Sequence, residues 1–458
     1  MKQLNCGLKH TLPVLALSFA IFLVAGCGGL GKYTSTVHES SGSVSPAGST
    51  MAHFVIQWPQ TRLHYRPAVI PVGTNRFVIY ISGANVSEAG TIAYIVDKPV
   101  SDTSTSVNIV VPSGSKRLFS VQARQVGLTK FTSPSIVALS DPALLDGSLL
   151  ASGNDAAAHD IVSGKSFTAT IVLAQSGIPD PSTTAVATTI NQVLSTYFPT
   201  VVAIQVICDQ SGNPITNMNA GNFDVTENGT SCVITDVRTV QQASSNLSTV
   251  LVLDRSGSME GEKNSALEAS ASQFVSLLQP ADTGEIINFS NQVEVTQPFT
   301  SDQGLLTNAI QGQFGRFAGG TALFDGIHQG ITDSAKQGGR EAVIVLTDGQ
   351  NNLGQYNSQD DILAAKQNNI PIFTIGLGAD ADAQVLGDIA AHTGGIYTAA
   401  PSASDLAAIY QNISHQLNGQ IQLSFISPDS TKSGTARHVV VNVHYGSLTA
   451  QSTYDYVL

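Results

Sequence analysis

The 458-residue chain has little charge, few cysteines and no excess of basic residues. Asp, Glu, Lys and Arg together make up 12% of the residues, and there are four cysteines. Lys and Arg number 21 against 33 Asp and Glu. Nucleic acid is not an expected partner, because its phosphates are bound by clustered basic side chains. Low charge with abundant Gly, Ser, Thr and Asn favours an extracytoplasmic, β-rich protein over a cytosolic enzyme.

The chain also lacks the spacings of several enzymatic sites. A phosphate loop needs G-x-x-x-x-G-K-[ST], but in "GSMEGEKN" Gly257, Gly261 and Lys263 have the wrong spacing. Ser256 and Ser258 do not lie in a G-x-S-x-G turn, and the ten histidines show no H-E-x-x-H spacing. No enzyme is expected, and a metal-dependent hydrolase stays only as an alternative.

The N-terminus has the pattern of a targeting segment. Lys2 and Lys9 precede an apolar stretch over residues 11–24, which is too short for a permanent membrane span. "VAGC" then places small residues before Cys27 and resembles a bacterial lipobox, in which the cysteine is lipidated. By the same resemblance, Gly28 favours the outer membrane of a bacterial envelope. The alternative is an ordinary secretory signal with an incidental cysteine.

Two cysteines remain after the signal and the lipidation site. Residues 1–26 are the expected signal peptide, and residues 27–50 are an expected Gly/Ser-rich tether. Cys208 and Cys232 would then lie in an oxidising compartment, where a disulfide between them is expected. The alternative is two buried free thiols.

The rest of the chain divides into β-rich and α/β segments. Residues 51–175 contain short β-type runs separated by turn residues, which predict an antiparallel, immunoglobulin-like sandwich. Residues 176–198 are an expected linker, and residues 199–246 an expected β-module. The strands of residues 419–458 are too few to bury a core alone. We therefore expect them to complete the β-module, with residues 247–418 inserted between the two parts.

Two stretches within these segments carry local predictions. "SDPALLDGSLLASGNDAAAHD", residues 140–160, is expected to be a loop insertion in the sandwich. "AVATTINQVLSTYF", residues 185–198, is expected to include a short helix. In residues 247–418, apolar runs alternate with amphipathic stretches, which predicts a doubly wound, mainly parallel sheet covered by helices on both faces.

Polar side chains gather where strands of this predicted sheet end. Asp254 ends the strand "STVLVLD" and is followed by Ser256 and Ser258 in "DRSGSM". Thr321 precedes a predicted helix, and Asp348 ends the strand "EAVIVLTD". Ligand sites of such sheets lie at the carboxyl ends of the strands. Hydroxyl and carboxylate oxygens suit a hard divalent cation, Mg²⁺ first, with Mn²⁺ or Ca²⁺ as alternatives.

This constellation resembles the von Willebrand factor A domain with its metal-ion-dependent adhesion site. The family motif is Asp-x-Ser-x-Ser followed by a distant Thr and a distant Asp, and all of these occur here in family order. The resemblance implies that the hydroxyls and the two carboxylates hold the metal, and that a partner protein supplies an Asp or Glu to an open position. Arg255 is expected to be a solvated surface residue, with contact to the partner as the alternative.

Taken together, these features predict an envelope-anchored lipoprotein whose metal site binds a protein, for adhesion or scaffolding. The lipid anchor would be its contact with the membrane. A polar turn alone would explain "DRSGS" but not the later Thr321 and Asp348. One alternative is an accessory subunit of a secretion or pilus-type machine, and another is a degenerate site with a structural role.

Overall fold

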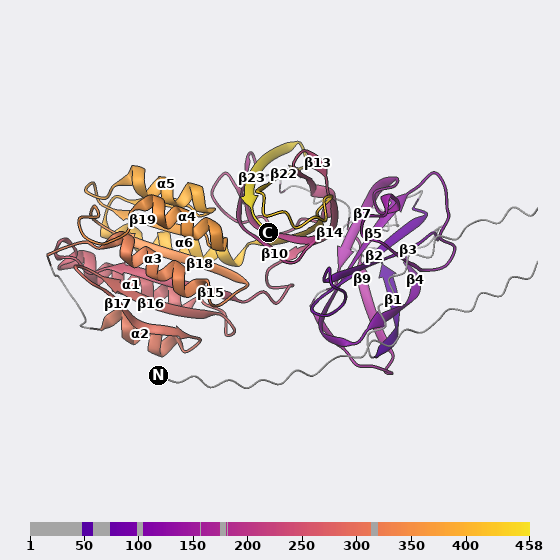
Figure 1. Cartoon of the computed structure of the whole chain (residues 1–458), viewed down its shortest axis with the longest axis horizontal. Coiled ribbons are helices and arrows are strands. Elements are labelled where there is room, and N and C mark those ends of the chain that lie inside the picture. The colour runs from indigo at the N-terminus through magenta and orange to yellow at the C-terminus, as the bar shows by residue number, and fades with distance from the viewer. Residues whose placement is uncertain are drawn as a thin grey trace, which may run out of the picture. The chain divides into compact units, whose positions relative to one another are not determined.

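The computed structural model describes residues 48–57, 74–98, 104–155, 157–174, 180, 182–312 and 319–458 (Figure 1). The predicted signal peptide, the lipidation site at Cys27 and most of the predicted tether lie outside these residues. In the described part of the chain, no helix is both long enough and apolar enough to cross a membrane.

A six-stranded sheet forms the centre of residues 247–418, in the order β17-β16-β15-β18-β19-β20. Neighbouring strands are parallel, except that β16 and β17 pair antiparallel at one edge. Continuous apolar runs such as "TVLVLD" form strands that are buried on both faces. The strands are β15 (Leu247–Asp254), β16 (Thr283–Phe289), β17 (Val293–Thr300), β18 (Arg340–Thr347), β19 (Ile372–Leu377) and β20 (Tyr397–Ala400).

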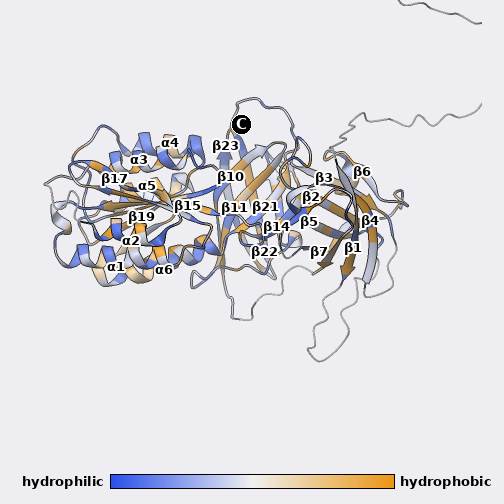
Figure 2. Ribbon diagram, turned by 90° about the horizontal axis from the view of Figure 1, so that it is seen from below, coloured by the Kyte–Doolittle hydropathy of each residue, from blue (hydrophilic) through white to orange (hydrophobic). Residues whose placement is uncertain are grey.

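Helices cover both faces of this sheet, as expected (Figure 2). One core cluster joins α1, α2 and α6 to one face, and a second joins α3, α4 and α5 to the other. The predicted apolar stripes are confirmed by the burial of Leu267 and Phe274 on α1 and Ile413 on α6. Helix α2 was not predicted. Only two of its side chains, Leu306 and Ile310, are buried, so its sequence gives only a short helical apolar pattern. The helices are α1 (Glu262–Ser276), α2 (Gln303–Gln311), α3 (Leu323–Ser334), α4 (Ser358–Asn368), α5 (Ala383–Thr393) and α6 (Leu406–Asn418).

Strands from before and after this α/β region pair in two four-stranded sheets. One has the order β10-β11-β21-β14 and the other the order β13-β12-β22-β23. The chain leaves this β-module after β14 and returns at β21, which lies between β11 and β14. The strands are β10 (Val186–Tyr197), β11 (Thr200–Asp209), β12 (Phe223–Glu227), β13 (Thr230–Ser231), β14 (Val233–Thr239), β21 (Ile421–Ile426), β22 (Arg437–Tyr445) and β23 (Leu448–Tyr456).

Strand β10 corrects two predictions for residues 176–198. This stretch contains a strand of the β-module where a linker with a short helix was expected. Ile190 and Val193 of β10 are buried in the module core, and the strand pairs antiparallel with β11. Its Val, Thr, Ile and Tyr residues favour a strand once a partner strand is available.

The N-terminal β-region also departs from its prediction. It has a three-stranded sheet, β4-β1-β9, and a larger sheet with the order β6-β3-β2-β5-β7, to which β8 adds on β5. β1 and β9 pair in parallel, so the region is not purely antiparallel. The predicted loop insertion contains β7, which pairs with β5, and β1 begins inside the predicted tether. The strands are β1 (Ser49–Gln57), β2 (Arg76–Ser82), β3 (Thr91–Val96), β4 (Ser104–Pro112), β5 (Gly114–Gln125), β6 (Ser135–Val137), β7 (Ser148–Asn154), β8 (His159–Ile161) and β9 (Phe167–Val172).

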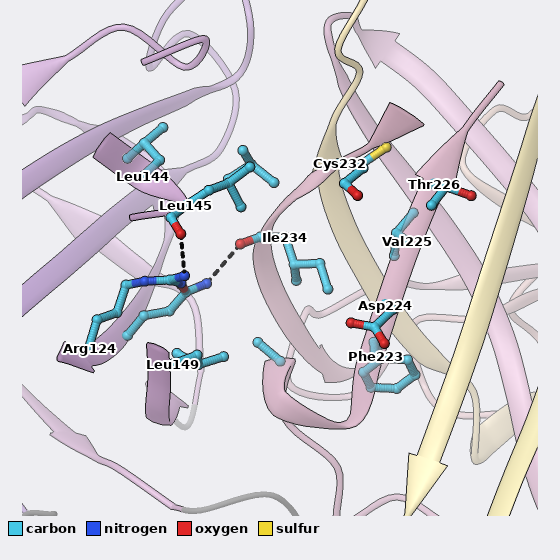
Figure 3. A pocket seen from close by; sticks show the side chains of 14 residues that line it. Arg124, Leu144, Leu145, Leu149, Phe223, Asp224, Val225, Thr226, Cys232 and Ile234 are labelled. Atoms are coloured by element: carbon cyan, nitrogen blue, oxygen red, sulfur yellow. Dashed lines mark hydrogen bonds between the residues drawn. The ribbon is translucent and has the colours of Figure 1, made fainter. Parts of the chain in front are cut away.

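Polar contacts join the N-terminal β-region to the β-module. The Arg238 guanidinium lies 2.9 Å from the Asp155 carboxylate, and the Gln122 amide donates to the Ile234 carbonyl at 2.8 Å. A cavity of about 280 Å³ lies beside this contact, with Arg124 and Leu145 on one side and Ile234 on the other (Figure 3).

Cys208 and Cys232 are both buried and free, so the disulfide prediction is wrong for this structure. Cys208 lies on β11 opposite Ala187 of β10, whereas Cys232 lies between β13 and β14 in the module core. Burial raises the pKa of Cys208 to about 11 and that of Cys232 to about 12. Both thiols therefore stay protonated at neutral pH.

Candidate metal centre

Asp254 lies at the carboxyl end of β15, where the order of the sheet reverses. The chain continues from β15 to β16 on one side and later adds β18 on the other. Ligand sites of doubly wound sheets lie at such a switch point. The Asp254 carboxylate is fully buried and accepts hydrogen bonds from the Ser256 amide at 2.8 Å and the Thr347 hydroxyl at 2.6 Å.

The loop after Asp254 brings two hydroxyls toward Asp348. The Ser256 and Ser258 hydroxyl oxygens are 3.1 Å apart. The Ser258 hydroxyl donates to the Asp348 carboxylate at 2.6 Å. Met259 of the same loop is buried in the core and anchors it. The turn after Asp254 and the parallel pairing of β15 with β18 thus bring a row of hydrogen-bonded side-chain oxygens to the carboxyl ends of these two strands.

Thr321 reaches the same edge from the loop before α3. Its side chain is buried, and its hydroxyl oxygen would lie 4.0 Å from a Cβ built on Gly349, the residue after Asp348. The Thr321 amide donates to the Asn352 side chain at 2.8 Å, which ties the two loops together. The structure therefore brings all of the predicted ligand residues, Asp254, Ser256, Ser258, Thr321 and Asp348, to one place.

Arg255 corrects the prediction of a solvated surface residue. It is 1% exposed, and its guanidinium donates to the Asn288 side chain at 3.1 Å and lies 3.0 Å from the Glu268 carboxylate. Its backbone amide donates to the Phe289 carbonyl at 2.7 Å. Arg255 thus fixes the site loop to β16 and α1, which spacing along the sequence could not show.

Lys263 is a second residue of this site that the sequence motif does not identify. It lies in the first turn of α1, and its ammonium group pairs with the Asp348 carboxylate oxygen that does not accept from Ser258. Its side chain is 37% exposed. The sequence shows that a basic residue follows the motif, but not that it pairs with Asp348, which lies 85 positions further along the chain.

The charges of the site favour a bound cation. Burial raises the pKa of Asp254 above its ordinary value, and the negative charge of Asp348 raises it further, although hydrogen bonds from Thr347 and Ser256 oppose this. A cation would favour the ionised carboxylates.

The donor set fits a hard divalent ion, because it offers carboxylate and hydroxyl oxygens. Among the described residues, no group of three or more His, Cys, Asp or Glu side chains is placed to hold a metal. An ion here would be held by hydroxyl as well as carboxylate oxygens.

The comparison with protein families decides the nature of this region. Residues 249–412 match the model of the von Willebrand factor type A domain. The chain contains a type A domain. The match begins in β15, ends in α6, and so includes all of the predicted ligand residues of this domain.

Two curated relatives resemble the chain over part of their length. Inter-alpha-trypsin inhibitor heavy chain H4 of Bos taurus is 26% identical over 201 residues, which are 39% of this chain and 21% of that protein. An uncharacterized protein of Synechocystis sp. is 28% identical over 159 residues, or 32% of this chain and 36% of that protein. The match thus spans well under half of either relative.

Solved structures with similarity to the type A domain include the vWF domain of the type V pili tip protein Mfa5 from Porphyromonas gingivalis. It is 15% identical, with a TM-score of 0.33, over 38% of this chain and 95% of that one. Another is proximal thread matrix protein 1 from the mussel byssus, with zinc in its MIDAS motif. It is 18% identical, with a TM-score of 0.36, over 39% of this chain and 47% of that one.

Replacing Lys263 by Gln is expected to raise the affinity of the site for Mg²⁺ about tenfold. Two unit charges 4 Å apart interact by about 4 kcal/mol at an effective dielectric of 20, and solvent exposure of the lysine reduces this to about 1.4 kcal/mol, or tenfold. Isothermal titration with Mg²⁺ measures the change. Lys336→Gln is the control, because Lys336 pairs with Asp333 on α3. Unchanged or weaker binding by Lys263→Gln would contradict the prediction.

The free energy of unfolding is expected to fall as pH rises because of Asp361, a buried carboxyl on α4. Burial raises the pKa of this carboxyl to about 8, so the folded state retains a proton that the unfolded state releases near pH 4. The unfolding free energy should fall between those pH values, by up to about 1.4 kcal/mol per pH unit. Buried Glu285 and Glu341 also have raised pKa values, so Asp361→Asn should reduce the slope in denaturant titrations rather than remove it, and the exposed Asp388→Asn should leave it unchanged. Parallel wild-type and Asp361→Asn curves would refute it.

Proposed function

We propose that the chain binds a partner protein through a divalent cation held by Asp254, Ser256, Ser258, Thr321 and Asp348. The observation that carries this proposal is the convergence of two buried carboxylates and three hydroxyls at the switch point of a type A domain. Hard oxygen donors of this kind suit Mg²⁺ first, and Mn²⁺ or Ca²⁺ next. Type A domains serve protein interaction and adhesion, which agrees with this role.

The charge of the site supports a partner with an acidic side chain. Asp254 and Asp348 bring at most two negative charges to a doubly charged ion, and Lys263 offsets one of them. A carboxylate from a partner Asp or Glu would add the charge and the oxygen ligand that this set leaves open. The residues of this chain would hold the ion in position, and the strength of binding to the partner would then depend on the carboxylate that the partner supplies.

We further propose that the protein is held at the bacterial envelope by a lipid on Cys27, with the outer membrane favoured. The support is the "VAGC" sequence after a short apolar stretch. The Gly/Ser-rich stretch that follows would let the folded part stand away from the membrane. The N-terminal β-region (β1 to β9) and the β-module (β10 to β14 and β21 to β23) would then be supporting domains, and an immunoglobulin-like relationship of the first stays a prediction.

The test is a pull-down from envelope extract with the wild-type chain in Mg²⁺ or in EDTA, repeated with Thr321→Ala. The proposal expects a partner that is retained in Mg²⁺, released by EDTA and lost with Thr321→Ala. Capture that is equal in Mg²⁺ and EDTA contradicts it.

A further inference from the structure

The loop from Gly349 to Asn357, called here the 349–357 loop, connects β18 to α4 directly after Asp348. The Asn352 amide donates to the Thr321 carbonyl at 3.1 Å, in addition to the bond from the Thr321 amide to its side chain. The Asp325 carboxylate of α3 accepts from the backbone amides of Gln355 at 2.7 Å and Tyr356 at 3.1 Å. The loop is thus pinned both to Thr321 and to the first turn of α3.

Close packing at two glycines confirms how tightly this loop is held. Gly354 has φ 117°, and a Cβ there would lie 2.5 Å from an Asp325 carboxylate oxygen. A Cβ on Gly320 would lie 2.2 Å from a terminal methyl of Leu353. The positive φ and the Asp325 contact favour glycine at position 354, whereas a Cβ at position 320 would have to displace the end of the Leu353 side chain. The second contact also places Leu353 directly over the residue that precedes Thr321.

Although the loop is pinned, it presents two large apolar side chains to solvent. Leu353 is 44% exposed and Tyr356 is 39% exposed. The Tyr356 ring is stacked on the His328 ring of α3, with centroids 3.5 Å apart and planes 10° apart. The Leu353 side chain thus lies against Gly320, next to Thr321, and the Tyr356 ring lies against α3, while part of the apolar surface of each stays uncovered. Exposed apolar surface next to a binding site is a mark of an interaction surface.

The stretch that follows Ser258 has a different character. Glu260 and Glu262, which follow Ser258 and begin α1, are exposed. Lys263, which follows them and pairs with Asp348, is also partly exposed, so this stretch offers charged groups and no large exposed apolar side chain. An apolar side chain of a ligand would therefore find apolar surface on the 349–357 loop, at Leu353 next to Gly320 and at Tyr356 on α3, rather than on the stretch after Ser258.

We propose that Leu353 and Tyr356 form an apolar docking surface for a partner segment in which an apolar side chain neighbours the metal-binding Asp or Glu. The inference rests on the proposed metal-dependent binding and specifies which acidic segments are chosen. Leucine and tyrosine already held in place lose little conformational freedom on binding, so their contacts contribute to affinity. We expect an apolar neighbour to strengthen binding about tenfold over serine.

The experiment uses the whole chain and synthetic octapeptides with one central Asp, whose neighbours are Leu, Phe, Ser, Lys or Glu. Binding is measured in excess Mg²⁺ and in EDTA for wild type, Leu353→Ser and Tyr356→Ser. Leu363→Ser is the matched control, because Leu363 is a similarly exposed leucine in the middle of α4. Mg²⁺ titration of each variant checks that the metal site is intact.

The proposal expects wild type to bind peptides with Leu or Phe beside Asp about tenfold more tightly than those with Ser, only in Mg²⁺. Leu353→Ser and Tyr356→Ser should lose this preference at unchanged Mg²⁺ affinity, and Leu363→Ser should keep it. Mg²⁺-dependent binding without an apolar preference, or a preference that survives in Leu353→Ser, overturns this inference alone. If no Asp peptide binds in a Mg²⁺-dependent way, the proposed function fails as well.

Discussion

Replacing Asp254 by asparagine is expected to remove most of the stabilisation of the type A domain by Mg²⁺. The change keeps the size of the side chain but removes one of the two carboxylate charges that face the site. Outer-shell partners of metal ligands contribute about 10–100-fold to metal affinity, so loss of the Asp254 carboxylate, which would hold the ion directly or through water, should cost about 100-fold or more. Partner binding should be lost in parallel.

Thermal unfolding with and without Mg²⁺ measures this effect. At an ion concentration 100 times the wild-type Kd, the wild-type domain should gain about 2.7 kcal/mol of stability, whereas Asp254→Asn should gain at most about 0.4 kcal/mol. The metal-free melting temperature of each protein shows whether the substitution itself disturbs folding. This matters because Asp254 accepts from the Ser256 amide and the Thr347 hydroxyl, and an asparagine can keep only part of that pattern.

Asp380→Asn is the matched control for the Asp254 experiment. Asp380 follows β19 and is exposed at the same end of the sheet, so its removal changes the net charge equally without touching the ligand set. This variant should keep the full Mg²⁺ stabilisation. A normal Mg²⁺ response of Asp254→Asn would show that the ion, if bound, is held elsewhere.

Removing residues 419–458 is expected to unfold the β-module while the type A domain stays folded. The deletion takes away β21, the strand between β11 and β14, and the pair β22 and β23 of the second sheet. It also removes buried core residues, of which Leu423, Phe425 and Val441 are fully buried. Since loss of one such side chain costs about 2–5 kcal/mol, the total exceeds the 5–15 kcal/mol stability typical of a domain.

Hydrogen exchange of the truncated chain tests this expectation. Amides of β11 and β14 should lose protection, and amides of β15 and β18 should keep it. A point-mutation test compares Phe425→Ala with Gln422→Ala on the same strand. Phe425→Ala is expected to destabilise the module by about 3–5 kcal/mol. Gln422 is only partly buried, so its change should be small. Full protection of β11 and β14 after truncation would show that residues 199–246 fold without the C-terminal strands.

The ligand residues could be predicted from sequence because each depends on a local signal. Asp254 and Asp348 end continuous apolar strands, and parallel strands place their carboxyl ends at one edge. Thr321 follows "AGG" and precedes a helix with strong apolar periodicity. The supporting contacts carry no such signal: Arg255 is buried by Asn288 and Glu268, which lie 33 and 13 positions along the chain.

The β-rich parts were harder to predict for the same reason. Residues 185–198 have β-branched residues at irregular spacing, and neither a helix nor a strand is favoured until β11 offers a partner. The thiols of Cys208 and Cys232 could pair only if their strands were neighbours, which depends on pairing between distant segments.

The amino-acid sequence by itself determined the α/β alternation of residues 247–418, the edge of the sheet at which the oxygen donors gather, and their identity. Hydrophobic periodicity and the ends of strands depend on neighbouring residues, so both can be predicted from the sequence without a structure. Tertiary structure alone decided that Lys263 and Arg255 belong to the site, that β21 lies between β11 and β14, and that Leu353 lies partly uncovered next to Gly320 and Thr321. Those features depend on which distant segments pack together, and that packing depends on interactions throughout the chain.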